Sequence, residues 1–129
     1  MQQDYFHGIL VNMAFTDKSF PIHFNLFAKK NAGDWTLYGV EISRDGLDQA
    51  ITQIQTRMRD DAPFYAHLYD DQMLVVIFKN KVFKVTSHAS SWEDIMLYGK
   101  GLNIPQEQLD FWPNRFQDEV HYFEPANFI

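Results

Sequence analysis

The spacing of apolar residues along this chain changes from a period of two to a helical period and back again. Residues 22–29 alternate between two sets, of which the more apolar is Ile22, Phe24, Leu26 and Ala28. This alternation is typical of a β-strand. Within residues 44–60 the apolar positions fall at helical spacing, at Leu47, Ala50, Ile51, Ile54 and Met58. That spacing predicts an amphipathic helix that covers one face of a sheet.

Further strand candidates flank the predicted helix on both sides. Residues 5–15 and 35–43 precede it, and residues 64–69, 73–79 and 82–88 follow it. All five segments are rich in aromatic and branched residues and are bounded by turn sequences. Two short helices are predicted after them, in SSWEDIMLYGKG and IPQEQLDFWP. The sequence thus predicts an α+β fold in the order βββ-α-βββ-α-α, with a mainly antiparallel sheet of about five or six strands and helices packed on it.

The chain is predicted to form one domain, residues 1–129, with its C-terminal tail docked. Its 129 residues fit the usual size of a single domain, and no Pro/Gly/Ser-rich linker divides them. The tail carries the aromatic residues Phe116, Tyr122, Phe123 and Phe128. Free tails are rarely so apolar, so we expect this one to pack on the body of the protein.

Local signals predict where the helices begin and end. Asp45 is the expected N-cap of the first helix, and Pro63 is expected to end it, because the residue before a proline is disfavoured in helical conformation. Ser90 and Glu93 have the spacing of a capping box at the start of the second helix.

Register analysis of the predicted hairpins leaves one question open. A two-residue loop at Asn80–Lys81 places Phe78 opposite Phe83, and both strands then carry apolar residues on both faces, as central strands do. In the preceding strand, Tyr65, His67 and Tyr69 alternate with apolar residues. An even-length loop through YDDQ aligns these three with Leu74, Val76 and Phe78, whereas a three-residue loop aligns the other set. The sequence leaves both registers open.

Composition narrows the class of protein. The absence of cysteine excludes disulfides, thiolate nucleophiles and Cys-based metal sites. The net charge of −6 argues against nucleic-acid binding. The first residues lack the features of a signal peptide and no apolar run reaches the length of a membrane span, so we expect a cytoplasmic protein without membrane partners. Residues 91–129 hold seven acidic and two basic side chains, which suit solubility or a basic partner.

The polar residues form no known motif of catalysis or metal binding. The five histidines show no three- or four-residue pairing, and GxxxxGK[ST], GxGxxG and GxSxG motifs do not occur. The neighbouring pairs Asp60–Asp61 and Asp70–Asp71 are interpreted as turn residues, because Asp bonds its own backbone in turns. The sequence therefore predicts no catalytic residues, no metal ligands and no cofactor, and whether the protein is an enzyme stays open, with binding favoured.

Surplus aromatic residues are the remaining functional signal, since 16% of the chain is Phe, Trp or Tyr. We expect a non-catalytic binding or protein-interaction module, a homodimer, that uses an aromatic surface to hold a protein partner or a small apolar ligand. The candidate binding residues are Tyr65, His67, Tyr69, Trp112, Arg115 and Phe116. One alternative is a small enzyme or metal-dependent protein centred on Tyr65, His67 and Tyr69. A second alternative is that the acidic C-terminal third of the chain binds a basic partner.

Overall fold

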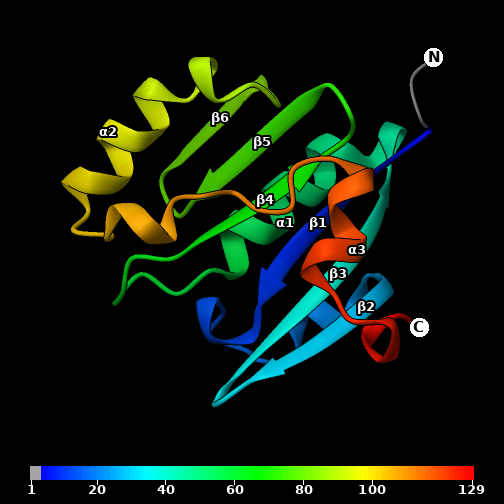
Figure 1. Ribbon diagram of the computed structural model, residues 1–129. Coiled ribbons are helices and arrows are strands. Elements are labelled where there is room, and N and C mark those ends of the chain that lie inside the picture. Colours follow the sequence, from blue (N-terminus) through cyan, green and yellow to red (C-terminus); the bar gives the residue numbers. More distant parts are fainter. Residues whose placement is uncertain (1–3) are drawn as a thin grey trace.

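The computed structural model describes residues 4–129, which form one six-stranded antiparallel sheet in the order β2-β3-β1-β4-β5-β6 (Figure 1). The strands are β1 (Tyr5–Val11), β2 (Asn25–Ala32), β3 (Trp35–Ser43), β4 (Tyr65–Tyr69), β5 (Met73–Phe78) and β6 (Lys81–Thr86). The first strand of the chain thus lies at the middle of the sheet, between β3 and β4. This arrangement confirms the predicted α+β fold with an antiparallel sheet.

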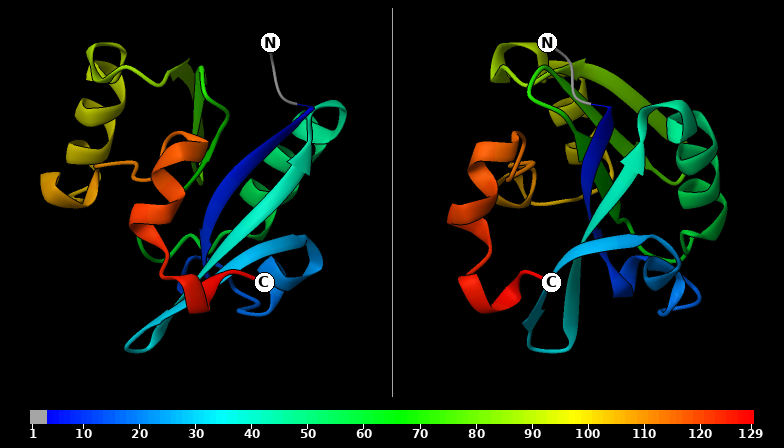
Figure 2. Two further views of the ribbon diagram at one scale, coloured as in Figure 1. Left: turned by 45° about the vertical axis from the view of Figure 1, so that its right-hand side comes forward. Right: turned by 90° about the vertical axis from the view of Figure 1, so that its right-hand side faces the viewer.

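Helices cover both faces of the sheet. The α-helices are α1 (Leu47–Arg57), α2 (Glu93–Gly101) and α3 (Glu119–Tyr122). Short 3₁₀ turns connect the elements: η1 (Asn12–Ala14), η2 (Phe20–His23), η3 (Arg44–Gly46), η4 (Ala89–Ser91), η5 (Gln106–Gln108), η6 (Phe116–Asp118) and η7 (Pro125–Asn127). The right-hand view of Figure 2 shows α1 on one side of the sheet and α3 on the other. Among residues 4–129, no helix is long and apolar enough to cross a bilayer.

The core under α1 is built from the face of the sheet that carries Leu10, Val40 and Leu68. Helix α1 contributes Ala50, Ile51, Ile54 and the following Met58. These are four of the five positions that the helical period predicts to face the sheet, and the fifth, Leu47, packs against the same core while partly buried. The apolar stripe therefore confirms the predicted packing of this helix.

The C-terminal segment, residues 102–129, covers the opposite face of the sheet. After α2 the chain crosses in front of β5 and β4 toward β1, and α3 then runs alongside β1 and β3 (Figure 1). Four buried side chains of the C-terminal segment pack with Leu74 and Val76 of the sheet: Ile104, Leu109, Phe111 and Phe123. The end of the chain pairs with β2, where the Ile129 amide donates to the Phe27 carbonyl at 3.0 Å. The predicted docking of the tail is confirmed.

Two strand predictions near the N-terminus are wrong in detail. The first strand ends at Val11 instead of residue 15, because the chain turns through η1. Residues 20–23 form η2, so β2 begins only at Asn25, and a bulge lies between Leu26 and Ala28. A bulge adds one residue to one strand, so it breaks the alternation of faces. Leu26 consequently packs in the core under α1, whereas Ala28 lies in the core on the other face.

The β5–β6 hairpin turns one residue earlier than predicted. Phe78 pairs with Lys81 and Val76 with Phe83, so the two-residue loop is Lys79–Asn80. Every partner shifts by two positions, which preserves the faces of the side chains because strands alternate with a period of two. Strand β5 is internal as expected, but β6 is an edge of the sheet.

The predicted helix boundaries are also corrected. The N-cap of α1 is Gly46 instead of Asp45, and the hydroxyl of Ser43 accepts from the Gly46 amide at 3.2 Å. The helix ends well before Pro63, because Met58 is already extended. The N-cap of α2 is Trp92 instead of Ser90, and no side chain caps this helix. The predicted helix after Pro105 is the single turn η5.

Candidate functional site

The turn between β4 and β5 determines which face carries the Tyr65, His67 and Tyr69 side chains. Tyr69 pairs with Leu74, and the Asp70 amide donates to the Met73 carbonyl at 3.1 Å. The loop is therefore even in length. All three side chains lie on the face that the C-terminal segment covers, beside Leu74, Val76 and Phe78.

Asp70 holds this turn in place. Its carboxylate accepts from the amides of Gln72 and Met73 at 2.8 and 2.6 Å, and Arg44 pairs with it at 2.7 Å. Burial opposes ionisation of Asp70, but these donors outweigh it and hold the pKa below its ordinary value. The next residue, Asp71, accepts from the Phe116 amide at 3.0 Å. Asp70 thus has the turn role predicted for it, whereas the Asp71 side chain bonds to the C-terminal segment.

His67 is a neutral, buried ring. It is 5% exposed, and burial lowers its pKa to about 4. Nε2 lies 2.7 Å from the carbonyl oxygen of Pro113. A carbonyl can only accept, so Nε2 carries the proton and Nδ1 is an unprotonated acceptor.

The hydroxyl groups on either side of His67 are both engaged by the C-terminal segment. Tyr65 donates to the carbonyl of Gln108, and Tyr69 donates to the carboxylate of Glu119. Burial raises the pKa of both tyrosines. These hydroxyls act as fixed hydrogen-bond donors that hold the segment on the sheet.

Glu119 also bonds to a histidine on β1. Its carboxylate lies 2.6 Å from Nδ1 of His7, while Nε2 of the same ring lies 3.0 Å from Glu41. The His7 ring stacks on Phe27 with centroids 4.0 Å apart and meets the edge of Phe116. This cluster closes one end of the interface between the sheet and the C-terminal segment.

A pocket of about 290 Å³ lies next to this cluster, between the sheet and the C-terminal segment. The sheet side is lined by Ile9, Val11, Trp35, Leu37, Tyr65 and His67, with Pro63 and Phe64 before β4. The C-terminal segment contributes Ile104, Glu107, Gln108, Asp110, Trp112 and Tyr122. Mostly apolar walls with a few polar groups are typical of small-molecule sites.

Phe111 fixes the course of the segment beside the pocket. Its backbone adopts φ 50°, a conformation that is unfavourable for a bulky residue, and its side chain is 0% exposed. The ring packs against Tyr65, His67 and Trp92. Burial of the ring offsets the backbone strain, and the peptide bond between Trp112 and Pro113 is cis. Asp110 and Trp112, the neighbours of Phe111 in the chain, line the pocket.

One polar atom on the sheet side of the pocket has no partner within the protein. The Nδ1 atom of His67 makes no hydrogen bond to any residue in the described range 4–129. No buried side-chain nitrogen or oxygen within that range lacks a partner, so Nδ1 is not a buried atom. His67 is one of the residues that line the pocket.

The six candidate residues separate into three places. Tyr65, His67 and Trp112 come together in the pocket. Tyr69 and Phe116 lie next to it, around His7. Arg115 belongs to neither group, and its Nε atom lies 3.9 Å from Oδ2 of Asp118.

Several pocket residues escaped sequence reasoning. They include Trp35, Leu37, Asp110 and Tyr122. They come from β3 and from two separate parts of the C-terminal segment, and no spacing in the sequence links them. The density of aromatic residues in the last third was the one available signal.

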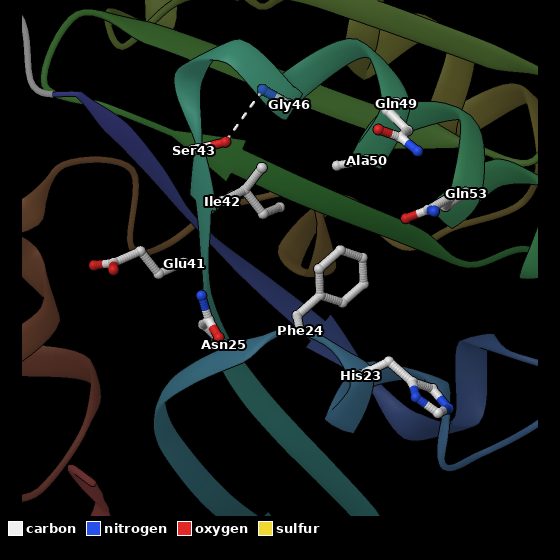
Figure 3. A pocket seen from close by; sticks show the side chains of 10 residues that line it. All are labelled: His23, Phe24, Asn25, Glu41, Ile42, Ser43, Gly46, Gln49, Ala50 and Gln53. Carbon is white, nitrogen blue, oxygen red and sulfur yellow. Dashed lines mark hydrogen bonds between the residues drawn. The ribbon is translucent and has the colours of Figure 1, made fainter.

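A second, more polar pocket lies between β2, β3 and α1 (Figure 3). Gln49 and Gln53 on α1 lie across it from Phe24 and His23, while Glu41 points away from it toward the C-terminal segment. That orientation agrees with the bond between Glu41 and His7. Within residues 4–129, no group of three or more His, Asp or Glu side chains is arranged to hold a metal ion.

Comparison with known proteins adds no relative, since no protein-family model, curated protein or solved structure matches this chain.

Proposed function

We propose that the protein is a non-catalytic binding protein that holds a small, largely apolar organic molecule in the pocket between the sheet and the C-terminal segment. The observation that carries this proposal is the pocket of about 290 Å³, which is lined by aromatic residues and by His67, whose Nδ1 acceptor bonds to no group among residues 4–129. A pocket of this size is at the lower end of small-molecule sites. Trp35 and Trp112, exposed by 42% and 38%, offer ring surface to a ligand.

The same groups favour binding over proton transfer. With a pKa of about 4, His67 is a weak base near neutral pH. The Tyr65 hydroxyl is bonded to a carbonyl, and its raised pKa opposes formation of a phenolate. A general base works best when its pKa lies near the operating pH, so neither residue is tuned for acid–base chemistry.

Titration with a small neutral aromatic compound tests this function. We expect indole to shift the amide resonances of Ile9, Leu37 and His67 in spectra of the full chain. Replacement of either rim tryptophan, by Trp35→Ala or Trp112→Ala, should weaken binding at least about fivefold, because buried aromatic anchors dominate binding energies. The matched control is Leu97→Ala, which removes an exposed apolar side chain on α2. Indole shifts scattered over the surface, or equal effects of all three variants, would refute the proposal.

The other expected partners have less support. Among the acidic residues of the C-terminal third, Asp118 and Glu119 are buried and bond within the protein, which leaves fewer carboxylates for a basic partner. The homodimer remains a proposal whose support is the set of exposed apolar side chains: Ile22, Leu97, Val120, Phe128 and Ile129. Sedimentation analysis over a range of protein concentrations tests it, and a monomer throughout that range would exclude it.

A further inference from the structure

The charged groups of the pocket are all of one sign. Glu107 and Asp110 line it, and no Lys or Arg is among its lining residues. Asp110 is exposed, and within residues 4–129 it pairs with no cationic side chain. The Asp110 carboxylate accepts one hydrogen bond from the described residues, a long contact of 3.4 Å from the Trp112 amide. The pocket thus contains a carboxylate that forms no ion pair with any residue of the described part of the chain.

One lysine lies near the pocket, against Tyr122, which is one of its lining residues. The Nζ atom of Lys30 donates to the Tyr122 carbonyl at 2.9 Å and lies 4.6 Å from the centroid of the Tyr122 ring. Lys30 does not line the pocket. Its ammonium group is bound to Tyr122 at the C-terminal end of α3, and it forms no ion pair with Asp110.

Two hydrogen-bond acceptors, on His67 and Asp110, favour the same kind of ligand as the negative charge does. The unprotonated Nδ1 of His67 is an acceptor, and so are the carboxylate oxygens of Asp110. The Tyr65 hydroxyl, a donor, is already used by Gln108. Gln108, Trp35 and Trp112 also line the pocket and carry side-chain donors, so the preference for a ligand with donors applies to the part of the ligand that meets Asp110 and His67.

Aromatic rings favour the same kind of ligand. Trp35, Tyr65 and Trp112 line the pocket, together with Tyr122, whose ring already contacts the Lys30 ammonium group. The face of an aromatic ring is electron-rich and attracts cations, most strongly for Trp. The rings also cover an apolar body, so they suit a molecule that combines an aromatic or aliphatic body with a positive group.

We infer that the ligand is an organic amine that is protonated at neutral pH and carries an apolar, preferably aromatic, body. The ammonium group lies toward Asp110, and an N–H group of the ligand donates to Nδ1 of His67. The body lies against Trp35, Trp112 and the apolar residues of the sheet. Ligands with a carboxylate or phosphate group are disfavoured, because they would meet the charges of Glu107 and Asp110. This inference rests on the proposed binding function and specifies the chemistry of its ligand.

Three related probes distinguish the proposed binding function from the inferred preference for an amine. At pH 7.5 tryptamine is a cation, indole is neutral and indole-3-propionate is an anion. We expect the full chain to bind tryptamine about threefold to fivefold more tightly than indole, which is the range for a carboxylate–ammonium pair near a surface. Indole-3-propionate should bind most weakly. The preference for tryptamine should shrink at high salt, because salt screens exposed charges.

Two variants with the same change of charge locate the effect. Asp110→Asn should reduce the affinity for tryptamine to nearly that for indole, whereas Asp94→Asn, in the first turn of α2, should leave the preference unchanged. If indole or indole-3-propionate binds as tightly as tryptamine, or if Asp110→Asn keeps the preference, the inference is wrong and the binding function stands. If none of the three probes binds, the binding function itself is wrong.

Discussion

The carboxylate of Glu119 lies 2.6 Å from Nδ1 of His7, although 112 positions of the chain separate the two residues. This contact joins the middle strand of the sheet to the last α-helix. The same carboxylate accepts the hydroxyl proton of Tyr69, so a single side chain of the C-terminal segment bonds to both β1 and β4.

Replacement of Glu119 by glutamine should destabilise the fold. The variant Glu119→Gln keeps the size of the side chain but removes the charge from two buried hydrogen bonds. We expect the free energy of unfolding to fall by about 1–3 kcal/mol, the range for bonds to charged groups. Urea denaturation measures the change, and the exposed Glu93→Gln is the control. Equal stability of the two variants would contradict the role of Glu119.

Acid should lower the free energy of unfolding through the titration of His67. Burial places the pKa of this ring at about 4, below its ordinary value of 6.5. Between these values the unfolded chain binds a proton that the folded chain does not, so stability is complete above pH 6.5 and is lost as the pH falls toward 4. The difference in pKa corresponds to about 3 kcal/mol.

The variant His67→Gln isolates this contribution. Between pH 7 and 4.5 its free energy of unfolding should fall by about 2–3 kcal/mol less than that of the wild type. The exposed His121→Gln should follow the wild type. Parallel losses in all three proteins would mean that His67 is not buried in its neutral form.

Loss of charge at Asp70 should loosen the β4–β5 turn. The variant Asp70→Asn removes the ion pair with Arg44 and weakens two bonds from backbone amides, which we expect to cost about 1–3 kcal/mol at pH 7. Because the pKa of Asp70 is lowered in the folded state, its contribution is complete above the ordinary value of 3.8 and is lost as the pH falls further. Thermal unfolding at pH 7 tests this, with the exposed Asp60→Asn as control. A melting temperature equal to that of the control would refute it.

A methyl group at Gly39 should disturb the stack on His7. A Cβ atom there would lie 2.6 Å from the Phe27 ring, and that ring stacks on His7 at 4.0 Å. Gly39→Ala should therefore cost about 1–3 kcal/mol through overpacking. Gly101→Ala is the matched control, since a Cβ at that position meets nothing within 4 Å. If chemical denaturation gives both alanine variants the same stability, the close packing of Phe27 on Gly39 is not important.

Much of the fold could be predicted because it depends on local patterns. The helical spacing from Leu47 to Met58 identified α1 and its buried face, and residues 35–43 coincide with β3. Errors arose where a local irregularity interrupts a period, as at the bulge between Leu26 and Ala28. Periodicity assumes regular geometry, so a single extra residue reverses every later assignment of face.

The candidate site was predicted only in part. Tyr65, His67 and Trp112 were identified from their residue types, and they do line one pocket. Asp110 was counted only as part of an acidic region, because its role depends on where Phe111 anchors the chain. A bulky residue at positive φ has no sequence signature, since tertiary burial alone offsets its strain.

The sequence by itself determined that Tyr65, His67 and Tyr69 share one face of a strand, because alternation is a property of the extended backbone. It also determined that an acidic turn follows them, since aspartate bonds its own backbone there. Only the tertiary structure decided which face they occupy and what covers it. That choice depends on the even loop held by Asp70 and on contacts from Glu119, Phe111 and Pro113, which are distant in the chain. Such long-range contacts come from the packing of whole layers, and no local pattern encodes them.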